Sequence, residues 1–449
     1  MNETIAAIAT PPGRGAIAIV RCSGPDARRI AARVFRTRVP LLDRVATYGE
    51  ILDVDGCVLD TGLALAMDAP RTATGETVVE LHVHGSPVVA RETLRALLHA
   101  GARAAGPGEF TRRAFLNGKL DLSAAEAVAD VIEAESRAGA RAAHANLSGG
   151  LRAQIVAIAA ELATLLEELA GAIDYPDEIP EPARAEAAQR LAALDARLAE
   201  LTADWERGRL VREGLSLAIV GPPNAGKSSL LNALLGEERA IVAPVAGTTR
   251  DVIEERFAID GVLVRVLDTA GLRESDDAVE RSGIERARRA LAGAAVALVV
   301  VDGSRPLDAD ARAVLEATRE RPRVVLFNKS DLGGSAYAAR ADAERDALAG
   351  SAFDPATVAA LRGEIARVGW ESETPDLARP HLASARQAAA VARAREALER
   401  AGATLAGGDA LDLIAPELVV AIAALGEVTG AVVTEAILDG IFARFCVGK

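Results

Sequence analysis

The sequence reads Gly221-Pro-Pro-Asn-Ala-Gly-Lys-Ser-Ser229 after a mostly apolar run and at the start of a helix-like run, with the spacing G-x-x-x-x-G-K-S. The preceding run, Leu215–Val220, is typical of a buried strand, and the following run, Ser228–Leu235, is typical of a helix. Glycines at both ends of the loop let backbone N–H groups turn inward around an anion. Lys227 then brings a positive charge to the outer phosphates of a nucleotide, and Ser228 offers a hydroxyl to Mg²⁺. The stretch therefore predicts a P-loop within an α/β sheet.

Two further motifs supply what a triphosphate site needs around Mg²⁺ and the γ-phosphate. Gly247-Thr248-Thr249-Arg250-Asp251 lies in a loop after the first helix, where Thr249 is placed to complete the Mg²⁺ shell and to sense the γ-phosphate. Asp268-Thr269-Ala270-Gly271 ends a strand, where Asp268 can hold Mg²⁺ through water and the Gly271 amide can meet the γ-phosphate. Both motifs follow the P-loop in the order that a GTPase requires.

A fourth motif, Asn328-Lys329-Ser330-Asp331, points to guanine. Asp331 offers two acceptor oxygens to the two N–H donors on the guanine edge, a pair that adenine lacks. An ATPase would require Asp331 to be an ordinary solvated residue. A fifth stretch, Ser351-Ala352-Phe353, resembles the loop that backs the guanine, but Ala347–Gly350 before it has a poor strand pattern. This predicts either a short strand or a loose wall of the base site.

The residue after Gly271 is Leu272, where Ras-like GTPases place a glutamine that orients the attacking water. Hydrolysis therefore needs another device. Asn224 in the P-loop could lie beside a monovalent cation that neutralises transition-state charge, as an arginine finger does elsewhere. Alternatively, Asn224 is a loop residue that bonds its own backbone. The residues alone leave both interpretations open.

Hydrophobic periodicity divides the rest of the chain into parts. Residues 1–118 have a mixed α/β pattern, while residues 119–212 and 373–449 have helical patterns. Between them, residues 213–372 alternate strands and helices, with continuous apolar runs such as Val296–Val301 that indicate buried parallel strands. We therefore expect a multidomain α/β plus all-α protein. Its three parts are an N-terminal α/β domain, a discontinuous helical domain, and a Ras-like P-loop GTPase domain inserted into the helical one.

Local signals set more detailed expectations for the N-terminal and helical parts. Strands are expected at Thr4–Ala9, Ala16–Val20, Ala46–Leu52, Leu63–Met67 and Glu76–Val83, and helices at Pro25–Phe35 and Pro87–Ala100. Ser23 is expected to cap the first of these helices. Ser123 and Glu126 have the spacing of a capping box, in which each side chain satisfies a backbone amide at the helix start.

Composition excludes several classes of protein. The 449 residues carry a formal net charge of −13, which argues against a general nucleic-acid coat or a membrane-surface binder. Three widely spaced cysteines fit a reducing compartment without a disulfide framework. The sequence shows neither a signal-peptide pattern nor an apolar run of about 18 residues. We therefore expect a cytoplasmic protein that does not enter a membrane.

Longer motifs resemble one family, the MnmE (TrmE) tRNA-uridine-modification GTPases, over nearly the whole chain. The matching stretches are Ala9-Thr10-Pro11-Pro12-Gly13-Arg14-Gly15, Pro107-Gly108-Glu109-Phe110-Thr111, Arg113–Leu122, Asp268–Glu274, Leu425-Gly426-Glu427-Val428-Thr429-Gly430 and Phe445-Cys446-Val447-Gly448-Lys449. The last of these, behind a GTPase domain, is the most specific. Two stretches depart from the family pattern, namely Ala243-Pro244, where many members have polar residues, and the weak Ser351-Ala352-Phe353 loop.

The resemblance implies a cytosolic homodimer in which the N-terminal domain binds folate and the GTPase domains pair across their nucleotides. It implies a partner, the FAD-dependent flavoprotein MnmG (GidA), and a tRNA substrate. Together such proteins add an aminomethyl or carboxymethylaminomethyl group to C5 of the wobble uridine in certain tRNAs. A tetrahydrofolate derivative, 5-formyl or 5,10-methylene, supplies the carbon, and K⁺ stimulates GTP hydrolysis.

The resemblance also assigns residues. The nucleotide site would comprise Asn224, Ala225, Gly226, Lys227, Ser228, Ser229, Ala243, Pro244, Val245, Ala246, Gly247, Thr248, Thr249, Asp268, Thr269, Ala270, Gly271, Asn328, Lys329, Asp331, Ser351, Ala352 and Phe353. Mg²⁺ would be held by Ser228 and Thr249, and K⁺ by Asn224, Ala243, Val245 and Thr248. Catalysis would rest on Asn224, Lys227 and Glu280, the last of which would activate the attacking water through a second water.

The matching positions for folate are Arg21, Glu80, Lys119 and Lys449. Cations suit the glutamate tail of folate, and a carboxylate suits the N–H groups of the pterin, although each residue alone would pass as a surface charge. Cys446 is either a nucleophile near the one-carbon unit or a buried free thiol.

Two other functions compete with the tRNA-modifying enzyme. A ribosome-assembly GTPase that reads RNA directly would need an appended basic domain, which this acidic chain does not show. A folate-dependent transfer protein with a purely structural GTPase domain is disfavoured because Lys227, Ser228, Thr249 and Asp268 are all present.

Overall fold

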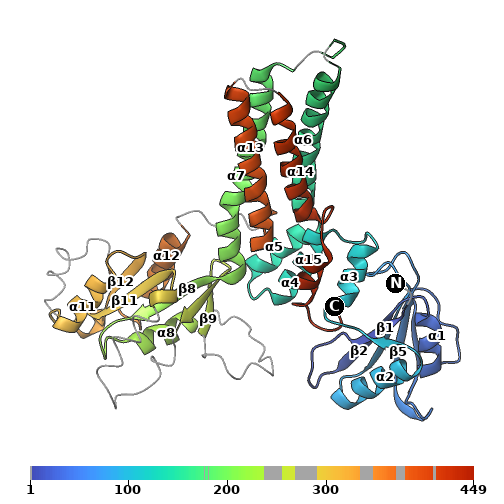
Figure 1. Ribbon diagram of the computed structural model, residues 1–449. Helices are drawn as coiled ribbons and strands as arrows, with labels where there is room; N and C mark the ends of the chain where they lie inside the picture. The colour runs from blue at the N-terminus through green and yellow to red at the C-terminus, as the bar shows by residue number, and fades with distance from the viewer. Residues whose placement is uncertain are drawn as a thin grey trace. The chain divides into compact units, whose positions relative to one another are not determined.

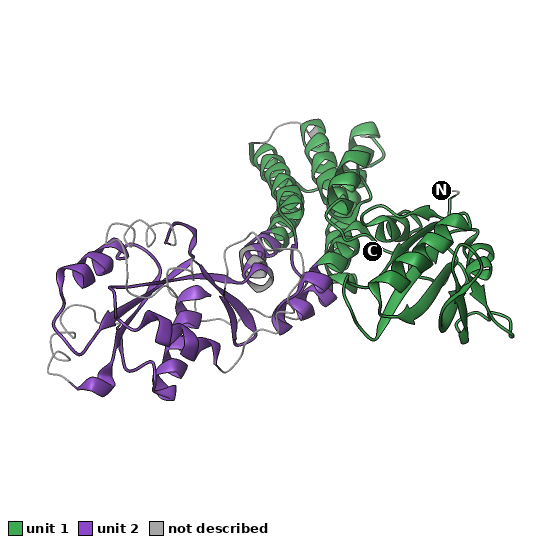
Figure 2. Ribbon diagram, turned by 90° about the horizontal axis from the view of Figure 1, so that it is seen from below, with its two compact units in different colours: residues 1–129, 146–198, 384–449 green, residues 130–145, 199–383 purple. Residues whose placement is uncertain are grey.

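The computed structural model describes residues 3–175, 177–179, 182–236, 255–267, 291–333, 347–370, 380–407 and 411–449. The chain divides into two compact units (Figures 1 and 2). Unit 1 contains residues 1–129, 146–198 and 384–449, and unit 2 contains residues 130–145 and 199–383. Unit 1 combines an α/β part with long helices, and unit 2 is built on a largely parallel sheet (Figure 1). The predicted fold class, multidomain α/β plus all-α, is therefore confirmed.

The N-terminal part of unit 1 is a seven-stranded sheet in the order β3-β4-β5-β6-β2-β1-β7. The strands are β1 Ile5–Ile8, β2 Ile17–Ser23, β3 Phe35–Arg36, β4 Ala46–Leu52, β5 Val58–Met67, β6 Val78–His84 and β7 Arg103–Ala104. All described pairings are antiparallel except that of β1 with β7. The helices are α1 Ala27–Val34, α2 Pro87–His99 and α3 Glu109–Leu116.

Alternation along the central strands decides which face of this sheet is buried. In β6, Val79, Leu81 and Val83 are buried in the core that also contains apolar residues of α1 and α2. Glu80 and His82 point to the opposite face, because successive side chains of a strand alternate. The sheet thus offers a polar stripe on the face away from its core.

The prediction that Ser23 caps α1 is wrong. The residue that precedes α1 is Asp26, and Ser23 is instead the last residue of β2. The Ser23 hydroxyl lies 2.8 Å from Thr74 Oγ1 and 2.8 Å from Glu76 Oε2, so it serves a tertiary network rather than the helix end.

The helices of the remaining chain are α4 Leu122–Glu133, α5 Arg137–Leu147, α6 Gly150–Asp174, α7 Arg184–Glu213, α13 Ala385–Gly407, α14 Ala415–Thr429 and α15 Glu435–Phe442. Short 3₁₀ turns occupy Ser330–Leu332 and Leu411–Leu413. In unit 1, α14 packs along both α6 and α13 (Figure 1). The buried residues of α6 include Ile155, Ile158, Leu162 and Leu165, whose spacing of three and four places them on one face. No helix of the described ranges is long and apolar enough to cross a membrane.

The predicted capping box of α4 is also wrong. Asp121 Oδ1 accepts a hydrogen bond from the Ala124 amide at 3.0 Å and another from the Ser123 hydroxyl. Glu126 turns away from the helix start and accepts hydrogen bonds from Arg386 at 2.8 Å and from the buried Gln387 at 2.5 Å. The charged Arg386 stabilises the Glu126 carboxylate more than a neutral backbone amide would.

Unit 2 contains a six-stranded sheet in the order β13-β12-β11-β8-β10-β9. Its strands are β8 Leu215–Val220, β9 Glu255–Ile259, β10 Val262–Leu267, β11 Val296–Asp302, β12 Arg323–Asn328 and β13 Leu348–Ala349. Only the β9–β10 pairing is antiparallel in the described sheet. The helices around it are α8 Lys227–Leu235, α11 Ala309–Ala317 and α12 Pro355–Gly369.

This sheet is buried on both faces. In β11, Val296, Leu298 and Val300 belong to one apolar core, whereas Ala297, Val299 and Val301 belong to the other. A continuous apolar run is therefore the correct pattern for this strand. The arrangement directs the carboxyl ends of β8, β11 and β12 to one edge of the sheet, where α/β proteins bind their ligands.

Candidate functional site: a nucleotide edge and a polar stripe

The P-loop connects β8 to α8, and both of its glycines are required by close approach. A Cβ atom on Gly221 would lie 2.1 Å from the carbonyl oxygen of Val300 in the neighbouring strand. Gly226 has φ +94°, and a Cβ atom there would lie 2.2 Å from Asn328 Nδ2. Any side chain at these two positions would push the loop away from β11 or β12. The motif spacing thus reflects how tightly the loop sits on the sheet edge.

Lys227 lies over this loop. Its ammonium donates hydrogen bonds to the carbonyl oxygens of Gly221 at 3.0 Å and Pro222 at 2.7 Å. Burial lowers the pKa of Lys227 below its usual value of 10.5. Two carbonyl acceptors and no carboxylate surround this half-buried cation in the described structure, so an incoming phosphate would find a positive charge that is not already neutralised.

Asn224, Ser228 and Ser229 complete the described part of the P-loop. Asn224 is exposed and has φ 60°, a left-handed conformation that asparagine tolerates better than most residues. Ser228 and Ser229 belong to the first turn of α8, where N–H groups without helical partners favour an anion.

The Asn328-Lys329-Ser330-Asp331 motif is joined to the P-loop through one buried amide. Asn328 Nδ2 donates to the carbonyl oxygen of Ala225 at 2.9 Å, and Asn328 Oδ1 accepts from the Ala352 amide at 2.9 Å. The Asn328 side chain therefore connects three segments of the site. Asp331 lies beyond it, exposed in the 3₁₀ turn, as a residue that contacts a ligand from solvent should be.

Two alternatives were predicted for the segment before Ser351, a short strand or a loose wall of the base site. The structure shows a short strand. Strand β13 has two residues and pairs parallel with β12. Backbone bonds continue the connection, since Gly350 N donates to Phe327 O at 3.1 Å and Ser330 N donates to Gly350 O at 3.0 Å. Ser351 and Ala352 are buried, whereas Phe353 is 79% exposed.

The remaining nucleotide-site residues lie outside the described part of the chain. They are Ala243, Pro244, Val245, Ala246, Gly247, Thr248, Thr249, Asp268, Thr269, Ala270, Gly271 and Glu280. Their assigned roles remain predictions.

Unit 1 carries a second cluster on the polar stripe of its sheet. Arg21 in β2 and Glu80 in β6 are cross-strand partners, and Arg21 Nε lies 2.8 Å from Glu80 Oε1. Glu80 Oε2 lies 3.3 Å from His82 Nε2. The Arg21 guanidinium also stands 5.7 Å from the ring centre of Phe110, a cation–π distance.

Residues 446–449 pack against this cluster. Arg21 donates to the carbonyl oxygen of Gly448 at 3.5 Å, and the Phe110 amide donates to the carbonyl oxygen of Lys449 at 3.1 Å. Gly448 has φ +101°, and a Cβ atom on it would lie 2.3 Å from the carbonyl oxygen of Ile8. The structure thus brings Arg21, Glu80 and the backbone of the last motif together.

Lys119 and Cys446 are placed differently. Lys119 is exposed after α3 and its side-chain stem lies beside Gly75; it makes no described hydrogen bond or ion pair with Arg21, Glu80 or Lys449. Cys446 is exposed, so its interpretation as a buried thiol is wrong.

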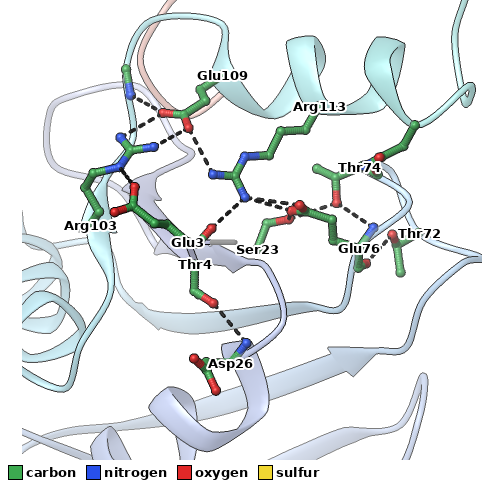
Figure 3. A network of polar contacts seen from close by, with 12 residues as sticks. Glu3, Thr4, Ser23, Asp26, Thr72, Thr74, Glu76, Arg103, Glu109 and Arg113 are labelled. Carbon is green, nitrogen blue, oxygen red and sulfur yellow. Dashed lines mark hydrogen bonds and ion pairs between the residues drawn. The ribbon is translucent and has the colours of Figure 1, made fainter. Parts of the chain in front are cut away.

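Sequence reasoning missed a buried ion network beside this cluster (Figure 3). The Arg113 side chain is 1% exposed and forms ion pairs at 3.0 Å with both Glu76 and Glu109. Burial acts to raise the pKa of Glu109, but hydrogen bonds from Arg103, the Gly106 amide and Arg113 outweigh it and lower the pKa from 4.5 to about 2. Arg113 stands in a quoted motif, but no local spacing identifies its distant partners.

The sheet of unit 2 has a P-loop after its first strand, Asn328 at the end of β12 and Asp331 just beyond it, and these features define the class of P-loop GTPases. Two family descriptions together cover nearly the whole chain, unit 2 included. The "GTP-binding protein TrmE N-terminus" matches residues 4–119, and the "MnmE helical domain" matches residues 122–446. The chain belongs to this family, the MnmE tRNA modification GTPases.

Similar proteins extend over its whole length. A tRNA modification GTPase MnmE from Chloroflexus aurantiacus is 45% identical, covering 100% of both chains. The protein of the same name from Neisseria meningitidis serogroup C is 44% identical, covering 99% of each. Among solved structures, a variant of Era from Aquifex aeolicus bound to GDP and AlF₄⁻ is 28% identical with a TM-score of 0.28, covering 40% of this chain and 66% of that one. The strand order described above, and not this last match, defines the fold of unit 2.

Proposed function

We propose that the chain is a K⁺-stimulated GTPase that modifies C5 of the wobble uridine in certain tRNAs. It acts as a homodimer with an FAD-dependent partner of the MnmG type, in the cytoplasm. The added group is aminomethyl or carboxymethylaminomethyl, and its carbon comes from a 5-formyl or 5,10-methylene tetrahydrofolate. GTP hydrolysis uses Mg²⁺ held by Ser228 and Thr249, and a water activated by Glu280.

The observation that carries this proposal is the cluster around Arg21. A pterin presents several N–H donors and an aromatic ring, and folate ends in a glutamate carboxylate. Glu80 supplies acceptor oxygens on the polar stripe, and its ion pair with Arg21 at 2.8 Å fixes the direction of the carboxylate. Phe110 adds an aromatic face beside the pair. Lys119 and Lys449 supply the cations that a glutamate tail needs.

The GTPase half is supported by the geometry of the sheet edge. Lys227 and the P-loop amides at this edge would hold the triphosphate, and the exposed Asp331 would read the guanine edge. The proposed domains are residues 1–118 for folate and dimerisation, 119–212 and 373–449 for the helical domain, and 213–372 for the GTPase. K⁺ is assigned to Asn224 together with Ala243, Val245 and Thr248.

Two measurements test the proposal. Nucleosides of tRNA from cells lacking this protein should lose the C5-modified wobble uridine, and an unchanged nucleoside profile would refute the modification. In calorimetry, purified protein should bind 5-formyl-tetrahydrofolate, and Arg21→Ala or Glu80→Gln should weaken binding at least tenfold, about the effect of one charge-assisted hydrogen bond.

The matched control for these variants is Arg36→Ala. Arg36 pairs with Glu50 at 2.6 Å, as Arg21 pairs with Glu80, but the Arg36–Glu50 pair lies at the β3–β4 edge of the same sheet. Folate affinity should be unchanged in this variant. If folate affinity falls equally in Arg36→Ala and Arg21→Ala, the loss comes from a less stable sheet and not from a lost folate contact.

A further inference from the structure

Asp302 is the last residue of β11 and belongs to none of the GTPase motifs. Its side chain is 10% exposed, yet both carboxylate oxygens have partners. Lys329 Nζ donates to Oδ2 at 2.8 Å, while the Ser304 hydroxyl and amide donate to Oδ1 at 2.6 and 3.0 Å. Arg305 Nε approaches Oδ2 at 3.5 Å. Such a set of donors fixes the direction of the carboxylate.

These donors also keep Asp302 charged. Burial acts to raise the pKa of this carboxyl, but the hydrogen bonds from Lys329 and Ser304 outweigh it, so the pKa lies below its usual value of 3.8. The contact with Lys329 is therefore a true ion pair at neutral pH.

Lys329, the partner of Asp302, has a strained backbone conformation within the guanine motif. Lys329 has φ 67°, an uncommon conformation for a residue other than glycine. It joins the end of β12 to the 3₁₀ turn that carries Asp331. A backbone held in this way persists only when its surroundings fix it, and the bond from Lys329 to Asp302 is one such restraint.

A second contact connects the ends of β11 and β12. Asp302 and Asn328 are register partners, and the Gly303 amide donates to the carbonyl oxygen of Asn328 at 2.8 Å. On its other side Asp302 shares a small crevice with Pro222 of the P-loop. Asp302 thus stands between the phosphate-binding and base-binding segments of the site.

We propose that Asp302 is a positioning residue for guanine recognition. Its carboxylate holds Lys329, and Lys329 holds the turn that aims Asp331 at the N1 and 2-amino groups of the base. The proposal rests on the GTPase assignment of unit 2 and is independent of the folate and tRNA chemistry. It predicts that loss of Asp302 weakens discrimination between guanine and hypoxanthine, because hypoxanthine lacks the 2-amino group.

The test compares GDP and IDP affinities of the full chain in a double-mutant cycle. In Asp302→Asn, the GDP-to-IDP affinity ratio should fall about fivefold, part of the value of a charge-assisted hydrogen bond. In an Asp331→Ala background, Asp302→Asn should leave the ratio unchanged, because the group that reads the 2-amino is already gone. The proposal is overturned if the ratio is the same in wild type and Asp302→Asn, or if it falls equally in both backgrounds.

Two variants separate positioning from stability. Asp308→Asn is the matched control, since Asp308 lines the same crevice and caps α11 through the Ala311 amide at 2.8 Å, and asparagine caps equally well. Its GDP-to-IDP ratio should equal that of wild type. If Asp302→Asn does not fold, Ser304→Ala provides the test. This variant removes the hydroxyl that donates to Asp302 Oδ1 but keeps the ion pair with Lys329. A ratio about twofold lower is expected there, and an unchanged ratio in folded Ser304→Ala would overturn the proposal.

Discussion

The side-chain amide of Asn328 donates a hydrogen bond to the carbonyl oxygen of Ala225 at 2.9 Å, and thereby joins the end of β12 to the P-loop. The same side chain accepts from Ala352 at 2.9 Å. Phosphate and base segments are therefore held in register before a nucleotide arrives. Preorganisation of this kind lowers the entropy that binding must overcome.

Asn328→Ala should weaken both GDP and IDP binding by a similar factor. The substitution leaves a buried carbonyl and a buried amide without partners, which costs roughly 1–3 kcal/mol for each group. Titration with a fluorescent GDP analogue and chemical unfolding of unit 2 would measure the two effects. Asn232→Ala, on the exposed face of α8, is the control and should change neither. Native affinity in Asn328→Ala would show that the two segments are held by other contacts.

Gly226→Ala should abolish nucleotide binding. The added methyl group would meet Asn328 Nδ2 at 2.2 Å, and φ +94° is unfavourable for alanine. Gly236→Ala is a matched control at the end of the same helix, where the nearest atom would lie at 3.4 Å and the backbone is right-handed. Equilibrium binding of GDP is the measurement. GDP binding by Gly226→Ala at wild-type affinity would mean that the loop can leave the sheet edge without loss.

GTP hydrolysis should be much faster in K⁺ than in Na⁺, and Asn224→Ala should remove most of that difference. A smaller ion fits poorly into coordination distances set for K⁺, and the exposed, left-handed Asn224 is the described residue assigned to hold it. Phosphate release measured at matched ionic strength would decide this. Equal rates in the two salts would refute a potassium site.

Glu109→Gln should destabilise the N-terminal sheet at pH 7 and much less at low pH. The pKa of Glu109 is about 2 in the folded chain and ordinarily 4.5, so its ionised form stabilises the fold above pH 4.5. That contribution is lost as pH falls from about 4.5 toward 2, and the gap between wild type and variant should close over this window. Hydrogen exchange of peptides from residues 3–118 would measure this stability difference between wild type and variant. The control Glu92→Gln removes an exposed pair with Arg95 and should show no gap.

Most of the sheet edge in unit 2 could be predicted from sequence. The predicted runs Leu215–Val220 and Val296–Val301 lie in β8 and β11, because a strand buried on both faces needs a mostly apolar sequence. The P-loop glycines also follow from their motif. In the N-terminal sheet, β4 coincides with the expected Ala46–Leu52, while β5 begins five residues earlier than expected, at Val58.

What could not be predicted depends on partners far apart in the chain. Local spacing suggested a cap at Ser23 and a capping box of Ser123 and Glu126, but Ser23 and Glu126 bond to distant partners instead. At the start of α4, Asp121 takes the capping role. No sequence motif marks Asp302, since its proposed function arises only when the ends of β11 and β12 lie side by side. Arg113 stood in a recognised motif, yet its pairing with Glu76 is visible only in the folded structure.

The bond from Arg21 to Gly448 spans 427 positions of sequence, and this has a consequence for biosynthesis. The sheet that carries Arg21 leaves the ribosome long before residues 446–449 are made, and the whole of unit 2 is translated in between. A nascent chain can therefore complete its GTPase sheet while the stripe around Arg21 still lacks its covering segment. We expect the nucleotide site to mature first, so that a chain interrupted in its last helix would consume GTP without forming the intact Arg21 cluster.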